Sequence, residues 1–249
     1  MLTAERRRTI LDRLQRDGKV VAAELVGALG VSEDTVRRDL RELAAQGLLQ
    51  RVHGGALPSA AAGGTFTERL EVHREDKAAL ARAALPLLDG AAVIVLDGGT
   101  TALELARRLP AGRACTVLTN APPVAAALAA HPRADVVLLG GRLLKPSLVT
   151  VGAETVDALR RVRADVAVLG ICSLHPDAGV TALDHDEAEV KRAMVEAAGE
   201  VVALATADKL RTAAPWVVAG IGELTQLVTD ADAEATAPFE AAGVTVVRA

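Results

Sequence analysis

Apolar residues recur every three or four positions in the first fifty residues, which is the spacing of the buried face of a helix. They form three groups: Ile10, Leu11 and Leu14; Val21, Leu25 and Leu29; and Val36, Leu40 and Leu43. A glycine follows each group, at positions 18, 30 and 47, and glycine commonly ends a helix. The pattern predicts three helices, the first over residues 3–16, the second ending at Gly30 and the third closed by Gly47.

The third helix is preceded by a residue that is suited to start it. The Ser32 hydroxyl can accept a hydrogen bond from a free amide of the first turn, and Glu33 and Asp34 favour the positive end of the helix dipole. Two helices joined by a tight turn that contains glycine are typical of a helix-turn-helix, whose second helix enters the DNA major groove. The first part of the chain therefore has the pattern of a DNA-reading module.

Arginines occupy the outer face of this third helix, because Val36 and Leu40 face inward. Such arginines can bind guanine edges or phosphates. Residues 48–52 then predict a short strand and residues 53–55 a turn, a hairpin wing that would lie beside the DNA backbone or minor groove. The candidate DNA-binding residues are Ser32, Glu33, Thr35, Arg37, Arg38, Arg41, Arg51 and His53.

A solvated helix face is the alternative for these charges taken alone. Arg37, Arg38 and Arg41 could then pair with Asp34 and Glu42. Helix, turn, capped helix and wing occur together within residues 1–57, and this combination favours a winged helix-turn-helix domain.

A linker is predicted at residues 58–66, where small and structure-breaking residues gather, as in Pro58-Ser59 and Gly63-Gly64. Residues 67–88 follow a helical pattern with charged positions on one side. We expect this segment to be a helix that packs on the second domain, and its position suggests that it relays the state of that domain to the DNA-reading module.

Short apolar runs alternate with helical patterns in the rest of the chain, residues 67–249. The predicted strands are residues 92–96, 115–118, 136–139, 166–169, 201–205, 226–229 and 244–247, and the predicted helices lie near 101–109, 122–130, 152–161, 185–198 and 231–241. This alternation is typical of an α/β fold with a mostly parallel sheet covered on both faces. Ligands of such sheets bind beyond the carboxyl ends of the strands.

The turn after the first of these strands is suited to hold an anion. In Asp97-Gly98-Gly99-Thr100-Thr101, two glycines let backbone amides converge, and two hydroxyls open the next helix. A plain glycine turn is the alternative. No phosphate-binding pattern of nucleoside triphosphate or dinucleotide sites is present, so neither ligand is expected.

Polar residues follow the other strands at the same edge of the sheet. Glu187 and Lys191 share a helix face after an Asp184 cap, so Lys191 is either a surface ion-pair partner or a cation at the ligand site. Lys209 follows the fifth strand and could reach a phosphate. The candidate effector-binding residues are Asp97, Gly98, Gly99, Thr100, Thr101, Thr119, Asn120, Gly140, Gly141, Glu187, Lys191 and Lys209.

Composition narrows the class of protein. The net charge is −4, but residues 1–57 carry +2 and the remainder −6, which suits a small DNA-reading module on an acidic body. The three aromatic residues, Phe66, Trp216 and Phe239, are too few for single-strand nucleic-acid binding, which depends on aromatic stacking. Cys115 and Cys172 form no redox or metal motif, and no signal peptide opens the chain, so a cytoplasmic protein without membrane contact is expected.

The chain resembles the DeoR family of bacterial sugar-metabolism regulators. In the first domain the resemblance rests on Thr35-Val36-Arg37-Arg38-Asp39-Leu40 and Arg51-Val52-His53-Gly54-Gly55-Ala56, and in the second on the segments at residues 96–101, 119–120, 140–141, 151–152 and 187–194 and on Lys209. It implies a sensor domain similar in fold to ribose-5-phosphate isomerase that binds phosphorylated sugars. Where the family usually has an A-D-x-S-K type segment, this chain has Thr206 and Asp208 before Lys209.

These observations predict a sequence-specific repressor that binds a double-stranded DNA operator as a homodimer or homotetramer and responds to a sugar phosphate, without cofactor, metal or catalysis. A sugar-phosphate isomerase-like enzyme with a DNA-binding head is the alternative, and Asp97, Asp184, Asp186 and Glu187 would be its candidate bases. A metal site at His175, Asp184, His185 and Asp186 is conceivable, although the spacing matches no zinc pattern.

Overall fold

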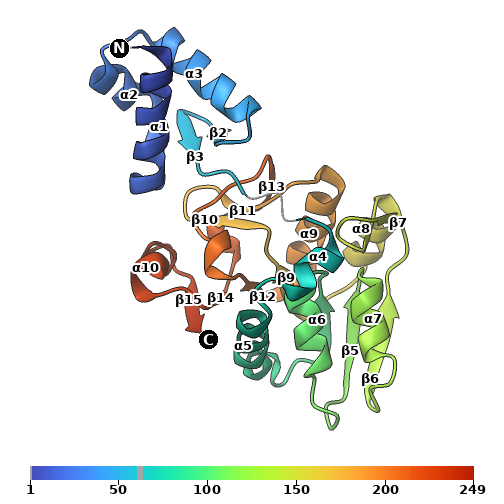
Figure 1. Cartoon of the computed structure of the whole chain (residues 1–249). Helices are drawn as coiled ribbons and strands as arrows, with labels where there is room; N and C mark the ends of the chain where they lie inside the picture. The colour runs from blue at the N-terminus through green and yellow to red at the C-terminus, as the bar shows by residue number, and fades with distance from the viewer. Residues whose placement is uncertain (1, 61–63) are drawn as a thin grey trace.

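The computed structural model describes residues 2–60 and 64–249, and places a small head above a larger α/β body (Figure 1). Residues 61–63 of the predicted linker lie outside the described residues. The head contains α1 (Thr3–Asp17), β1 (Val20–Val21), α2 (Ala22–Leu29), α3 (Glu33–Ala45), β2 (Gln50–Val52) and β3 (Gly55–Leu57). The three predicted helices and the wing are therefore confirmed.

The head has a core of its own. The predicted helix faces supply it, with Ile10 and Val36 completely buried and Leu25 1% exposed. The wing strand β3 lies between β1 and β2 and pairs antiparallel with both. The strand β1 was not predicted, because two residues are too short to produce a recognisable alternation.

The body is built on one seven-stranded parallel sheet whose strand order is β15-β14-β12-β9-β4-β5-β6. Its strands are β4 (Val93–Leu96), β5 (Cys115–Thr119), β6 (Ala134–Leu138), β9 (Ala164–Gly170), β12 (Ala198–Leu204), β14 (Gln226–Thr229) and β15 (Thr245–Arg248). All seven correspond to strands predicted from the sequence, and the α/β fold class is confirmed.

Helices α6 (Thr100–Arg107) and α7 (Pro122–Leu128) connect strands toward one edge of the sheet, whereas α9 (His185–Ala197) and α10 (Ala233–Ala241) connect strands toward the other. Right-handed crossovers in opposite directions place their helices on opposite faces. The direction changes between β4 and β9, which pair with each other. This switch point is where sheets of this kind bind ligands.

Smaller elements cover the carboxyl edge of the sheet. They are the hairpin β7 (Arg142–Leu144) and β8 (Val149–Val151), the helix α8 (Ala153–Arg160), and the three-stranded sheet of β10 (Ser173–His175), β11 (Gly179–Ala182) and β13 (Trp216–Ala219). Only α8 among them was predicted. The strands are short and β11 pairs with β13 across more than thirty intervening residues, so their local pattern is weak.

The predicted single helix over residues 67–88 is wrong. The chain forms α4 (Phe66–Glu71), α5 (Arg74–Ala84) and the short 3-10 helix η1 (Leu85–Leu88). The chain turns at His73, whose φ of 53° is left-handed. The Lys77 ammonium holds this turn by donating to the carbonyl oxygens of Arg69 and Val72, at the end of α4. The last carbonyls of α4 have no partner within the helix, and the buried Lys77 ammonium supplies one. This contact stabilises the break between α4 and α5.

The described part of the predicted linker is attached to the body. The Ala60 amide donates to the Ala213 carbonyl, and the Ala213 amide donates to the Pro58 carbonyl, each at 2.9 Å. Side chains also join head and body: Lys19 pairs with Asp177 at 2.9 Å, and the Arg211 guanidinium lies against Gly18.

Candidate functional site

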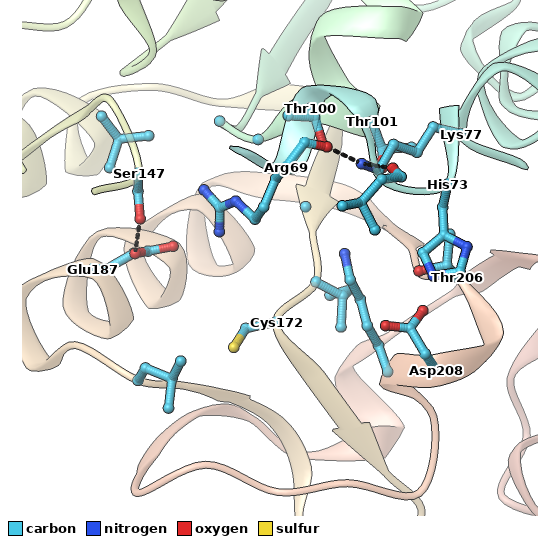
Figure 2. Close-up of a pocket in the computed structure, with 18 of the residues that line it drawn as sticks. Arg69, His73, Lys77, Thr100, Thr101, Ser147, Cys172, Glu187, Thr206 and Asp208 are labelled. Carbon is cyan, nitrogen blue, oxygen red and sulfur yellow. Dashed lines mark hydrogen bonds between the residues drawn. The ribbon is translucent and has the colours of Figure 1, made fainter. Parts of the chain in front are cut away.

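A cavity of about 330 Å³ opens at the switch point, beyond the carboxyl ends of β4, β9 and β12 (Figure 2). Its walls come from segments far apart in sequence: the α4–α5 turn, the start of α6, the β7–β8 loop, the end of β9, α9 and the turn after β12. A cavity of this size is in the range of small-molecule sites.

The start of α6 forms one wall, as the sequence predicted. Gly98, Gly99, Thr100 and Thr101 line the cavity, and both threonines are buried. Gly99 has a φ of 105°, which favours glycine, and a side chain on Gly98 would lie 2.2 Å from the Val149 side chain, so Gly99 is required by the backbone and Gly98 by the packing of β8. The free amides at the start of this eight-residue helix therefore face the site.

A buried ion pair fixes the switch point. Asp97 is 1% exposed and Lys191 3% exposed, and the Lys191 ammonium bonds the Asp97 carboxylate and donates to the Gly170 carbonyl at 2.9 Å. The Gly170 amide donates to the same carboxylate at 3.0 Å. Burial lowers the pKa of Lys191, but the Asp97 and Glu187 carboxylates outweigh it and raise that pKa. Lys191 is thus not a surface ion-pair partner: it is a cation that lines the cavity, is compensated by Asp97 and ties β4 to β9.

Three other cations form no ion pair within the described residues, although the Asp208 carboxylate lies near enough to offset part of their charge. Arg69, Lys77 and Lys209, the cation cluster, all line the cavity. Burial, with the charges of Lys209 and Arg69, lowers the pKa of Lys77 from 10.5 to about 8. Burial also lowers the pKa of Lys209. Cations that depress one another's proton affinity make a favourable site for an anion, which would relieve their repulsion.

The opposite wall is polar and acidic. Figure 2 shows Ser147 and Glu187 pointing toward each other, and the Ser147 hydroxyl donates to the Glu187 carboxylate at 3.0 Å. Glu187 lies 3.5 Å from the Lys191 ammonium. Carboxylate and hydroxyl groups of this kind accept and donate hydrogen bonds to the hydroxyls of a polyol.

Five predicted effector-binding residues do not line the cavity: Asp97, whose carboxylate is buried against Lys191, and Thr119, Asn120, Gly140 and Gly141. The Asn120 side chain donates to the Thr150 carbonyl at 3.0 Å, and the Gly140 carbonyl accepts from Thr155 at 2.6 Å. Asn120 thus holds β8 on the sheet, and Gly140 holds the start of α8. They lie apart from the cavity because β5 and β6 are on the far side of β4 from the switch point.

Several lining residues were missed by the sequence analysis. They are Arg69, Val72, His73, Lys77, Ser147, Val149, Gly170, Ile171, Cys172, Leu183, Thr206 and Asp208. Of these, Thr206 and Asp208 were noted only as departures from the family pattern. Arg69, His73 and Lys77 are basic positions at four-residue spacing. This spacing could have indicated that the three side chains lie on the same side of the segment, as they do at the cavity. Ser147 gave no local signal, because only the fold of the β7–β8 loop brings it to Glu187.

The predicted DNA-binding residues gather along α3 and the wing. The Ser32 hydroxyl accepts from the Thr35 amide at 3.3 Å and caps α3. Arg37, Arg41, Arg51 and His53 line one groove between α3 and the wing, while Arg38 faces a second hollow beside Thr35. Thr35 is half-buried, and the other seven predicted residues are exposed.

The ion pairs of α3 differ from those of the alternative interpretation. Arg37 pairs with Glu33 at 2.6 Å, one turn earlier. Within residues 2–60 and 64–249, no ion pair involves Arg38 or Arg41, and Glu42 pairs with Arg7 of α1. The outer arginines are therefore largely available to another molecule.

Both histidines of the alternative metal site make other contacts. The rings of His185 and Trp216 pack edge to face, with their centroids 4.6 Å apart. The His175 Nδ1 accepts from the Asp177 amide at 3.0 Å. Within the described ranges, no group of three or more metal-ligating side chains was found, and no helix has the length and apolarity to cross a membrane.

Two family models match the chain: the DeoR-like helix-turn-helix domain over residues 6–59 and the DeoR C terminal sensor domain over residues 72–231. The HTH-type transcriptional regulator GlpR of Haloferax volcanii is 36% identical, over 99% of this chain and 98% of the relative. The HTH-type transcriptional repressor GlcR of Bacillus subtilis is 32% identical, over 92% and 89%. The glycerol-3-phosphate regulon repressor of Escherichia coli is 30% identical, over 93% and 92%.

Among solved structures, ribose 5-phosphate isomerase A of Methanocaldococcus jannaschii is similar in part. Its TM-score is 0.40 at 17% identity, over 55% of each chain.

Proposed function

The chain belongs to the DeoR family of transcriptional regulators, and we propose that it represses transcription from a specific operator until a phosphorylated sugar or related metabolite occupies the cavity of its body. Each relative described above is named as a regulator or repressor, and the chain is a regulator rather than an enzyme. Such a protein acts where the chromosome is, which places it in the cytoplasm.

The observation that carries the effector proposal is the cation cluster beside the free amides of α6. A phosphate group would accept hydrogen bonds from the amides and compensate Arg69, Lys77 and Lys209. The sugar hydroxyls would then meet Ser147 and Glu187 across the cavity. This arrangement favours a small phosphorylated polyol over a neutral sugar, because a neutral ligand would leave the three cations uncompensated.

The DNA proposal rests on exposed arginines at the start of a capped helix. Arg37 and Arg38 would bind base edges or phosphates, with Arg41, Arg51 and His53 beside the backbone. Operators are commonly symmetric and need two heads, so we propose a homodimer or homotetramer held together by the body. Light scattering of the purified protein would measure this state directly.

The experiment for the DNA proposal measures binding to the protein's own promoter and to random DNA at near-physiological salt. Arg37→Ala combined with Arg38→Ala should lower operator affinity at least about thirtyfold, since each lost base or phosphate contact costs about 1–3 kcal/mol. Arg160→Ala with Arg161→Ala, two exposed arginines in succession on the body, is the matched control. Equal affinity of the wild type for both DNAs would overturn the proposal.

The experiment for the effector proposal measures thermal stabilisation by glycerol 3-phosphate, fructose phosphates and glucose 6-phosphate, each beside its unphosphorylated parent. A ligand that binds only the native state raises the melting temperature by mass action. The Arg37–Arg38 double variant should retain this stabilisation, because the cavity lies in the other domain. Stabilisation by the neutral parents alone would contradict a phosphate-selective cavity.

A further inference from the structure

We propose that Thr206 is the residue that reads the anionic group of the effector, by donating a hydrogen bond from its buried hydroxyl to an oxygen of a phosphate group. This inference rests on the proposed function, since it concerns the same cavity. It assigns the role to a residue that the sequence analysis noted only as a departure from a family pattern.

The Thr206 hydroxyl is a buried polar atom without a partner. Thr206 is 2% exposed and lines the cavity. Its Oγ1 has no hydrogen-bond partner among the residues that the structure describes. Burying a hydroxyl without a hydrogen bond is costly, so such an atom in a native protein calls for an explanation. A ligand in the cavity would supply the missing partner.

The backbone turn after Thr206 does not use the Thr206 hydroxyl. Thr206 precedes the 3-10 turn η2 (Ala207–Lys209) at the position where a threonine commonly caps the turn with its own side chain. Here no side-chain cap forms. The Lys209 amide, which such a cap could bind, donates to the Thr206 carbonyl instead, and the Ala207 amide donates to the Asp230 carboxylate at 2.7 Å. The backbone of this turn therefore does not engage the Thr206 hydroxyl, which remains available to the cavity.

The surrounding charges indicate what the hydroxyl would meet. The Lys209 amide donates to the Thr206 carbonyl at 3.0 Å, so Thr206 lies on the same turn as a member of the cation cluster. Arg69, Lys77 and Lys209 carry three positive charges, and Asp208 is the acid that lines the cavity on the same turn. The cations near Thr206 outnumber the acid on its turn, which favours an anionic group there, and the tetrahedral oxygens of a phosphate monoester can accept from the hydroxyl and from the cations together.

This assignment predicts an unusual combination of effects for Thr206→Val, which replaces the hydroxyl by a methyl group of similar size. The ligand-free protein should melt at the same temperature as the wild type or higher, because an unsatisfied buried hydroxyl is removed. The concentration of inorganic phosphate that gives half of the thermal stabilisation should rise about tenfold, because a charge-assisted hydrogen bond is lost. Thr206→Ser should restore the wild-type phosphate response.

Two reference variants separate the possible outcomes. Thr155→Val removes an equally buried hydroxyl that donates to Gly140, and should melt about 2–4 °C lower without a change in phosphate response. Lys209→Met lacks one cation of the cluster. The stabilisation of this variant by phosphate measures the general effect of the salt, which does not depend on the site. All variants are titrated with inorganic phosphate at constant ionic strength and followed by thermal unfolding.

Each outcome has one meaning. If the wild type shows no saturable stabilisation beyond that of Lys209→Met, the cavity has no anion site, and the proposed effector class is overturned as well. If Thr206→Val responds to phosphate as the wild type does, the role of Thr206 alone is overturned. If Thr206→Val is destabilised as much as Thr155→Val, the hydroxyl has a partner within the protein, and the inference is likewise overturned.

Discussion

Single residues of the cavity differ in how their charges are compensated. Lys77 is 5% exposed and satisfies two helix carbonyls, yet it lies near two other cations. Lys209 is held in the same region with a lowered pKa. Asp97 and Lys191, by contrast, compensate each other. The residues proposed to bind the effector thus differ from the residues that build the site in that no described ion pair neutralises them.

The lowered pKa of Lys77 predicts a pH dependence of stability. Between about pH 8 and 10.5 the unfolded chain retains a proton that the folded protein has lost at Lys77, so this residue makes stability rise with pH in that window. The full effect would be about 3 kcal/mol, and screening by solvent in the open cavity reduces it to roughly 1–2 kcal/mol.

Denaturant unfolding of Lys77→Met across this range should lack that rise, compared with the wild type and with Lys145→Met, which removes an exposed lysine. Curves for Lys77→Met and the wild type that stay parallel from pH 7.5 to 10.5 would contradict the prediction.

At the scale of elements, a buried ionic contact orients the helix proposed to read DNA. Asp39 of α3 is completely buried, and the guanidinium groups of Arg6 and Arg7 of α1 donate to its carboxylate. Burial would raise the pKa of Asp39, but these hydrogen bonds outweigh it and lower that pKa. The contact spans more than thirty residues of sequence and fixes α3 against α1, so that Arg37 and Arg38 keep one orientation.

Asp39→Asn should therefore lower the free energy of unfolding of the head by about 2 kcal/mol, since two arginines lose a buried carboxylate. The pKa of Asp39 is lower in the folded head than in the unfolded chain, where it is near 3.8. The carboxylate therefore contributes its full stabilisation at a pH above 3.8, and this stabilisation is lost as the pH falls through the pKa of the folded state.

Circular dichroism can follow this loss. Trp216, the only tryptophan, lies in the body, so its fluorescence reports the body separately. Glu42→Gln, on the partly exposed edge of the same contact, should cost less. Equal losses for Asp39→Asn and Glu42→Gln would show that burial of Asp39 is unimportant.

At the scale of the whole molecule, one segment connects the cavity with the head. Thr206 and Lys209 line the cavity, Arg211 packs against Gly18, and Ala213 pairs with the chain just after the wing. A ligand that shifts the turn at Lys209 would move contacts of the head within a few residues. Two arrangements of this segment, one of them favoured by the ligand, would suffice to change operator affinity. The Lys19–Asp177 pair is exposed and contributes little to such coupling.

Arg211→Asn tests this connection. Arg211 has a left-handed φ of 60°, a conformation that asparagine adopts readily, so the backbone should be retained while the contact with Gly18 is lost. We expect the melting temperature and effector affinity of the body to stay near the wild-type values, and the effector-induced change in operator affinity to fall at least threefold.

Operator binding measured with and without the most stabilising compound gives this ratio. Arg161→Ala is the control for the loss of an exposed arginine. An unchanged ratio in Arg211→Asn would rule out this route.

Local pattern alone determined much of this protein. The helix spacing of Ile10, Val36 and Leu40, the seven apolar strands and the Gly98-Gly99 turn could all be predicted, because helix faces, strand runs and glycine turns depend on residues within one or two turns of each other. Tertiary structure decided the rest. The strand order brought Asp97 to Lys191 across 94 positions and left Asn120 outside the cavity. Docking of the α4–α5 turn created the cation cluster, since cations from separate segments meet only when the sheet edge brings those segments together.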